Sequence, residues 1–186
     1  MGDDSQCIAY LARARFEGDS AHRLGALVVD QRGIPREFRC TAPVRPNAIQ
    51  TLLYGGTLQR HMLVTVMGAP LVNQLKERYS LLATSEPELL GLRGRLDCPV
   101  VWLRRQGEAS ALGKGLVAAD AESLIPHPGG RFEAAVMECA HGFSEDQSTA
   151  HQILTAAAAN MDVLEPFERV QRALAKVHEE KALEER

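Results

Sequence analysis

The sequence lacks any long hydrophobic run. No apolar stretch approaches the ~18–20 residues that a membrane-spanning helix needs. Residues 1–6 are acidic rather than basic, which is not typical of a signal peptide. We therefore expect a cytoplasmic protein with no membrane partner.

Cysteines are few and isolated. They are Cys7, Cys40, Cys98 and Cys139, and no two of them form a C-x-x-C pair. In a cytoplasmic protein, isolated cysteines are more often small buried residues than disulfide partners. Cys139 and His141 form a close pair, but the local spacing that marks a zinc site is missing. The sequence predicts no disulfide framework and no metal, and it leaves open a zinc site assembled from distant segments.

The motifs of common enzyme classes are missing as well. The chain has no G-x-S-x-G nucleophile turn and no G-x-G-x-x-G dinucleotide loop after a strand. We therefore predict no catalytic, cofactor-binding or metal-binding residues, and no cofactor. The sequence leaves enzyme activity undecided and leans against it, with an enzyme built on other motifs as the remaining alternative.

The composition that is present belongs to a globular protein. The 186 residues are 45% hydrophobic and 24% charged, which excludes a disordered or collagen-like chain. Residues 1–105 carry 14 Lys and Arg against 10 Asp and Glu, whereas residues 106–186 carry 7 against 14. We predict an α/β core domain over 1–105, a linker over 106–131, and a mainly helical C-terminal segment over 132–186 that packs on the core or on a partner.

Three strands are predicted near the N-terminus. Residues 7–16 and 34–41 alternate apolar with polar or small residues, which is typical of half-buried strands. Residues 24–30 are almost wholly apolar, as in a strand covered on both faces. A tight turn at Gly33 separates the second strand from the third, so the three form an antiparallel meander.

Helices follow the meander. Asn47 is a suitable N-cap for a helix over residues 48–67, which Gly55 and Gly56 interrupt. A further short helix is predicted over residues 71–78.

A strand–helix–strand unit comes next. Residues 79–84 and 99–103 are short apolar segments typical of buried strands. Between them, Ser85 and Glu88 have the spacing of a capping box and Pro87 suits a first helical turn, which predicts a short α-helix. The three elements together form a right-handed βαβ unit.

The C-terminal part is predicted to be mainly helical. Residues 132–139 fit a strand or a short helix, and a capping box at residues 144–147 begins a helix that runs to about residue 160. In the next helix, apolar residues recur at steps of four and three, the spacing of a helix laid on a partner. This seam either packs on the protein's own sheet or forms a protein interface, and it comprises Val163, Phe167, Val170, Leu174 and Val177.

The predicted fold class is α/β, with a mixed sheet made of the meander, a helix and the βαβ unit, followed by C-terminal helices. Over residues 7–103 this element order resembles the ribonuclease H-like fold. The resemblance implies carboxylates on the first strand, the first helix and the fourth strand, which in nucleases of that fold hold two metal ions.

The sequence departs from that carboxylate pattern at all three places. Strand 7–16 contains no Asp or Glu, with Glu17 just past its end, and residues 46–76 contain no acidic residue. The fourth strand ends in Thr84 and Ser85. Because Mg²⁺ prefers oxygen ligands, we expect the fold without a metal-dependent nuclease centre.

Two functions remain. The leading hypothesis is a non-catalytic interaction protein that works through protein–protein contacts, as a homo-oligomer or a subunit. The alternative is a nucleic-acid-associated protein with a degenerate ribonuclease H-like fold and an Arg-rich strand face. Its predicted phosphate contacts are Arg13, Arg15, Arg36 and Arg39. A ligand crevice is predicted at Thr84 and Ser85, at the carboxyl end of a parallel strand.

Overall fold

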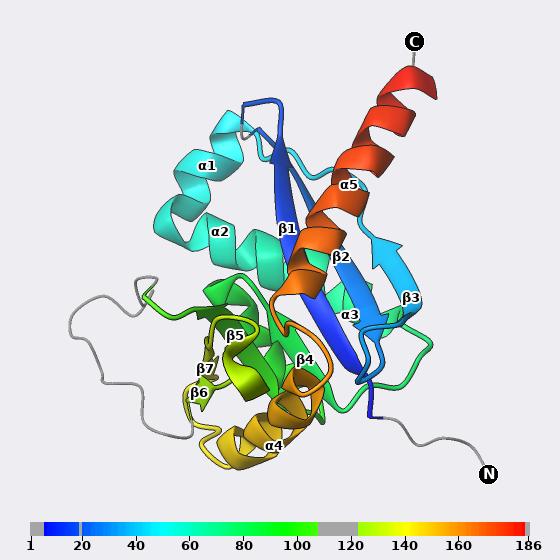
Figure 1. Ribbon diagram of the computed structural model, residues 1–186. Helices are drawn as coiled ribbons and strands as arrows, with labels where there is room; N and C mark the ends of the chain where they lie inside the picture. The colour runs from blue at the N-terminus through cyan, green and yellow to red at the C-terminus, as the bar shows by residue number, and fades with distance from the viewer. Residues whose placement is uncertain (1–5, 19, 108–122, 185–186) are drawn as a thin grey trace.

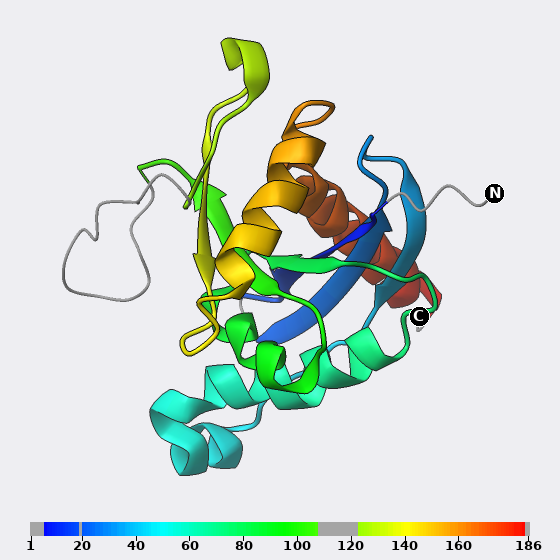
Figure 2. The same cartoon turned by 90° about the horizontal axis from the view of Figure 1, so that it is seen from below.

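The computed structural model describes residues 6–18, 20–107 and 123–184. It shows one seven-stranded mixed sheet, in the order β3-β2-β1-β4-β5-β7-β6, with helices on both faces (Figures 1 and 2). The strands are β1 Ile8–Phe16, β2 Ala21–Val29, β3 Pro35–Cys40, β4 Leu81–Thr84, β5 Val100–Arg105, β6 Leu124–Ile125 and β7 Ala135–Cys139. The helices are α1 Ala48–Tyr54, η1 Gly55–Thr57, α2 Leu58–Arg60, η2 His61–Gly68, α3 Ala69–Asn73, η3 Pro87–Arg95, η4 Pro128–Gly130, α4 Asp146–Ala158 and α5 Glu165–Glu184.

The predicted α/β fold class is confirmed. Strands β1, β2 and β3 form the antiparallel meander, and β4 and β5 then add in parallel beside β1. Gly33 has φ +78° in the turn between β2 and β3, a conformation that favours glycine. The Asp30 carboxylate accepts hydrogen bonds from the backbone N–H groups of Arg32 and Ile34, which fixes the same turn.

The helical run after the meander is continuous but irregular. It begins at α1 with the predicted cap, since Asn47 and Gln50 form a complete capping box. The predicted interruption at Gly55 is a 3₁₀ turn, η1, and η2 is a π-helix. The prediction of a helix over residues 71–78 was wrong in its end, because α3 stops at Asn73.

The element between β4 and β5 differs from the prediction. It is a 3₁₀-helix, η3, whose N-cap is Glu86 and which has no side-chain cap. The predicted capping box of Ser85 and Glu88 does not form, because the Glu88 carboxylate instead accepts a hydrogen bond from the Gln59 side chain of α2. The Glu88 side chain, which the local sequence pattern assigned to capping, thus makes a tertiary contact with α2 instead.

The C-terminal segment contributes strands as well as helices. Strand β7 pairs antiparallel with β5, and the two-residue β6 pairs with β7. Residues 132–139, for which strand and helix both fitted the sequence, therefore contain a strand. Of the predicted linker over 106–131, residues 108–122 lie outside the described residues.

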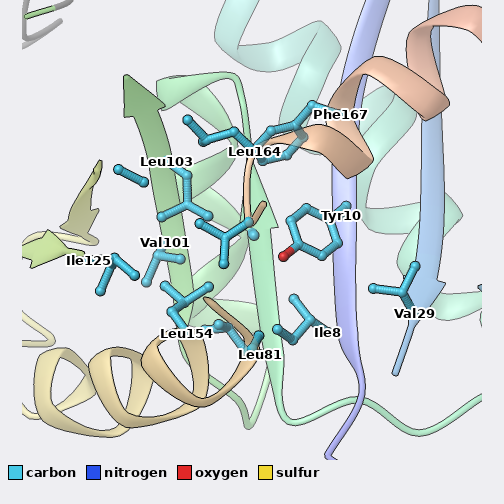
Figure 3. Packing of buried hydrophobic residues seen from close by; sticks show 14 of the residues in the cluster. Ile8, Tyr10, Val29, Leu81, Val101, Leu103, Ile125, Leu154, Leu164 and Phe167 are labelled. Atoms are coloured by element: carbon cyan, nitrogen blue, oxygen red, sulfur yellow. The ribbon is translucent and has the colours of Figure 1, made fainter. Parts of the chain in front are cut away.

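The apolar seam of α5 and the turn before it packs on the protein's own sheet, so its interpretation as a protein interface is corrected. Four of its five residues are buried, and Val177 is half-buried. Phe167 meets Tyr10 of β1 edge to face, with ring centroids 5.2 Å apart (Figure 3). Gly25 of β2 permits this close approach, because a Cβ there would lie 2.6 Å from Val170 Cγ1. The spacing reflects burial inside the chain.

Two apolar layers therefore sandwich the sheet. One lies under α4 and α5, and the other under η2, α3 and η3. Among the residues that the structure describes, no helix is both long and apolar enough to cross a membrane.

Candidate functional site

The candidate site lies at the carboxyl ends of the three parallel strands β1, β4 and β5. Strand pairing aligns Leu11 with Thr84, Thr84 with Trp102, and Trp102 with Glu138 of β7. Side chains two residues apart on a strand share a face, so Arg13 follows Leu11 on the same face. In open α/β sheets, ligands bind at this carboxyl edge.

A buried ion pair occupies the centre of this edge. Arg13 Nη2 donates to Glu86 Oε2 at 2.7 Å, and the two side chains are 4% and 17% exposed. The Thr84 hydroxyl accepts a hydrogen bond from the Glu86 backbone N–H at 3.0 Å, which fixes the start of the chain after β4. Burial raises the pKa of the Glu86 carboxyl, and the adjacent Arg13 guanidinium acts in the opposite direction.

This ion pair decides how well the site fits the two metal ions of nucleases with this fold. A metal centre needs carboxylates from separate elements, but β1 supplies the cation Arg13, and residues 46–76 supply no acid. Glu86 is the carboxylate that the sequence analysis missed, because it lies two residues past Thr84, inside the segment 85–88 that was interpreted as the start of a helix. Within the described part of the chain, no three His, Cys, Asp or Glu residues form a group suited to a metal ion. The residues described do not fit a two-metal centre.

Trp102 and Arg104 of β5 extend the site along the sheet from β4 toward β7. The Trp102 indole N–H donates to the Ser85 carbonyl at 3.3 Å. Arg104 pairs with Glu138 at 2.8 Å, and its guanidinium lies 5.4 Å from the centre of the Trp102 ring. These contacts tie the end of β4 to β5 and β7.

The predicted crevice at Thr84 and Ser85 is part of this site, but both residues serve the chain itself. Thr84 is fully buried, and its hydroxyl bonds to the Glu86 backbone. The Ser85 carbonyl accepts a hydrogen bond from the Trp102 indole N–H. The open space lies further along, beside η3.

A pocket of about 660 Å³ lies beside η3 and β7, and its lining begins at Pro87, the residue after Glu86. Its walls come from four separate segments: α2, η3, β5, and β7 with the loop that follows it. No local sequence motif marks such a pocket, because its residues meet only in the folded chain. The lining residues that carry its chemistry are Arg60, Glu88, Trp102, Glu138, His141 and Phe143.

The structure does not bring the four predicted phosphate-binding arginines together. Arg13 is buried against Glu86, and Arg15 is exposed near the end of β1. Arg36 and Arg39 belong to the edge strand β3, where each pairs with a carboxylate. Of the four, Arg15 is the one for which the described residues provide no ion pair.

Another exposed arginine, which the sequence analysis did not single out, lies at the pocket. Arg60 of α2 lines the pocket and has no ion pair among the described residues. Arg15 and Glu88 both lie close enough to Glu86 to influence its pKa. Arg15, near the Arg13–Glu86 pair, and Arg60, at the pocket, are thus two exposed guanidinium groups without an ion pair among the described residues.

The sheet order and the carboxyl-edge site define an α/β protein with the ribonuclease H-like arrangement of elements. No protein-family profile and no curated protein matches the sequence. The structure is similar to that of endonuclease V from Bacillus subtilis, with a TM-score of 0.58 and 10% identity, covering 96% of this chain and 84% of that one. It is also similar to endonuclease V from Streptomyces avermitilis, with a TM-score of 0.56 and 14% identity, covering 96% of this chain and 83% of that one.

These similarities overturn the leading hypothesis from the sequence. A non-catalytic protein that acts through protein–protein contacts was expected, but the similar solved structures are nucleases. The apolar seam that motivated the hypothesis is covered by the chain's own sheet. The alternative, a nucleic-acid-associated protein, agrees better with the structural neighbours.

Proposed function

We propose that this protein binds nucleic acid across the carboxyl edge of β1, β4 and β5. The observation that carries the proposal is the presence of two exposed arginines without an ion pair among the described residues, Arg15 near the buried Arg13–Glu86 pair and Arg60 at the pocket beside η3. Guanidinium groups bind phosphate oxygens in a planar, bidentate geometry. The likeness of the fold to two endonuclease V structures, enzymes named for cutting nucleic acid, supports the same ligand class.

The Arg13–Glu86 ion pair reduces the electrostatic repulsion between this edge of the sheet and a phosphate backbone. An uncompensated carboxylate at Glu86 would repel phosphates, but Arg13 at 2.7 Å neutralises it. Glu138 is likewise paired with Arg104. With Glu88 included, this region carries four guanidinium groups, Arg13, Arg15, Arg60 and Arg104, against three carboxylates, Glu86, Glu88 and Glu138, and the remaining positive charge favours attraction of an anion.

The same ion pair argues against two-metal cleavage as the chemistry of this edge. Arg13 stands on the strand where nucleases of this fold place a carboxylate, so the proposal rests on binding and invokes no metal-dependent step. The ligand is a polyanion held mainly through phosphate contacts.

The test is a salt-dependent binding measurement. Fluorescence anisotropy with a labelled single-stranded oligonucleotide, from about 50 to 200 mM salt, gives the slope of log K against log salt. The double variant Arg15→Ala/Arg60→Ala is expected to bind more weakly and to lower the slope by about 1.4, roughly 0.7 for each phosphate of a single strand that the variant no longer binds. Arg172→Ala is the matched control, because Arg172 is exposed on α5, on the other side of the sheet. No binding by the unmodified protein at low salt, or equal losses of affinity in the control and the double variant, contradicts the proposal.

A further inference from the structure

Helix α1 carries the three most exposed large apolar side chains among the residues that the structure describes. Ile49, Leu52 and Leu53 are 67%, 82% and 79% exposed. Their positions at i, i+3 and i+4 place them on one face of the helix, and we call them the α1 stripe. No residue of α1 is buried. Single exposed aliphatic side chains are ordinary, but three on one face of one short helix indicate a surface that another molecule covers.

The stripe is preformed and accessible. The Gln50 backbone N–H donates to Asn47 Oδ1 at 2.8 Å, and the Asn47 backbone N–H donates to Gln50 Oε1 at 3.0 Å, so the first turn of α1 is closed by its own cap. Figure 2 shows α1 at the margin of the molecule, away from the sheet. A partner can therefore reach the stripe without displacing any part of the chain.

The surroundings of the stripe favour an uncharged occupant. Residues 46–59 contain no charged side chain, and Arg45, just before them, is paired with Glu17. The stripe thus offers no group of its own to pair with a phosphate or with a charged peptide. A second copy of α1 has the matching chemistry, because its surface is equally apolar and equally free of charge. In a contact about a two-fold axis both copies use the same patch, and no like charges from residues 46–59 face each other.

We propose that two copies of this protein associate about a two-fold axis through their α1 stripes, with the Leu52 side chains close to the axis. This surface is distinct from the α5 seam, which the chain's own sheet covers. A helix of seven residues is about 10 Å long, so the contact is much smaller than the ~800 Å² per partner of a standard interface. The association is therefore weak and reversible, with a Kd expected in the range of about 10–100 μM.

Light scattering of the whole chain in solution measures this association. The mean mass is expected to rise from that of one chain, 20.3 kDa, toward twice that value. The rise should occur as the protein concentration increases from about 5 to 500 μM, a range that brackets the expected Kd.

Two charge variants test the contact. Leu52→Lys and Leu52→Glu each place like charges across the axis, so each variant alone is expected to keep the mass of one chain. An equimolar mixture of the two variants brings Lys opposite Glu and is expected to recover the rise in mass. Ile34→Lys is the matched control, because Ile34 is 46% exposed in the turn before β3, and it should associate like the unmodified protein. Since α1 buries no residue, all three variants should unfold at the temperature of the unmodified protein.

Several outcomes overturn the proposal. A mass of one chain for the unmodified protein at every concentration does so directly. A rise in mass that persists in both Leu52 variants, or one that Ile34→Lys abolishes as well, locates the contact elsewhere. A mixture of the two charge variants that stays at one chain contradicts the two-fold arrangement. If the unmodified protein stays at one chain but sediments with uncharged phosphatidylcholine vesicles, the stripe serves a lipid surface instead of a second copy.

Discussion

Arg13 is a guanidinium buried at the end of β1 with a single carboxylate beside it. Taking a charge out of water costs several kcal/mol, which only a close opposite charge offsets. Glu86 provides that charge at 2.7 Å, and the two depend on each other. The pair therefore holds the chain after β4 in place, and it neutralises the buried charges of Arg13 and Glu86 in the candidate site.

Replacing Arg13 alone is expected to destabilise the fold strongly. Arg13→Met leaves Glu86 buried without its partner and should lower the free energy of unfolding by about 3 kcal/mol, the lower end for a broken buried pair. Without Arg13, burial keeps the pKa of Glu86 raised, so the folded state takes up a proton more readily than the unfolded state. The destabilisation should therefore shrink as the pH falls through that raised pKa, as urea unfolding at several pH values would measure.

The double variant Arg13→Met/Glu86→Gln provides the control for that experiment. It removes both charges, so we expect it to recover most of the stability at neutral pH. If the single and the double variant are equally unstable at every pH, Arg13 acts through packing rather than through its charge.

At the residue scale, the sequence showed that strand 7–16 has no acidic residue, but it did not show that Arg13 would be buried beside Glu86. The structure places the buried Arg13 near the end of that strand. Glu86 was missed because a glutamate near a serine and a proline fits a helix cap equally well. Only the strand register, which aligns Leu11 with Thr84, shows that Arg13 and Glu86 meet.

At the scale of the elements, the Glu37 carboxylate links strand β3 to the backbone of residues 76 and 77, which precede β4. Glu37 Oε2 accepts the backbone N–H groups of Lys76 and Glu77, at 2.7 and 2.9 Å, and Glu37 Oε1 accepts from Arg39. The Glu77 N–H, together with Arg39 and the Lys76 N–H, holds the pKa of Glu37 below its ordinary value against the effect of burial. The ionised form of Glu37 thus stabilises the edge of the sheet.

This contact predicts a pH-dependent stability. Because the pKa of Glu37 is lower in the folded than in the unfolded protein, its contribution is complete above the unfolded value of ~4.3 and is lost as the pH falls through the folded value. Glu37→Gln is expected to cost on the order of 1–3 kcal/mol at neutral pH. The difference from the unmodified protein should vanish in acid, as thermal unfolding across pH would show. A difference that is constant with pH would mean that the charge of Glu37 plays no part.

The elements that the sequence predicted well are those with a strong local period. The meander was recoverable because apolar residues recur locally along residues 7–16 and 34–41. The prediction that strand 7–16 is half-buried was wrong, because β1 is buried on both faces from Ile8 to Arg13. The 3₁₀ geometry of η3 could not be predicted from the local sequence, since the Glu88 carboxylate accepts a tertiary hydrogen bond from Gln59 instead of capping the helix. The two-residue β6 was missed because its pairing with β7 has no period of its own.

For the molecule as a whole, α5 closes one face of the sheet. Its seam lies on β1 and β2, more than a hundred residues earlier in the sequence, and the C-terminal end of the helix extends past the strands (Figure 1). Arg23 of β2 is almost fully buried and donates to His178 of α5 at 3.2 Å. The heptad-like spacing alone does not reveal whether such a seam meets its own sheet or another chain, which is why the functional hypothesis built on it was wrong.

Deleting residues 161–186 is therefore expected to unfold the protein rather than to change its association with a partner. Each buried apolar side chain contributes about 1.5–3 kcal/mol, and the deletion removes six that are buried, Met161, Val163, Leu164, Phe167, Val170 and Leu174. Their summed contribution is comparable with the whole stability of a domain, about 5–15 kcal/mol. Circular dichroism and urea unfolding should show no cooperative transition for residues 1–160. A chain that ends at Lys181 keeps the seam and His178, and it should unfold like the complete protein. A cooperative transition of unchanged midpoint in the shorter chain would show that α5 is dispensable for the fold and that its apolar face is free to serve another surface.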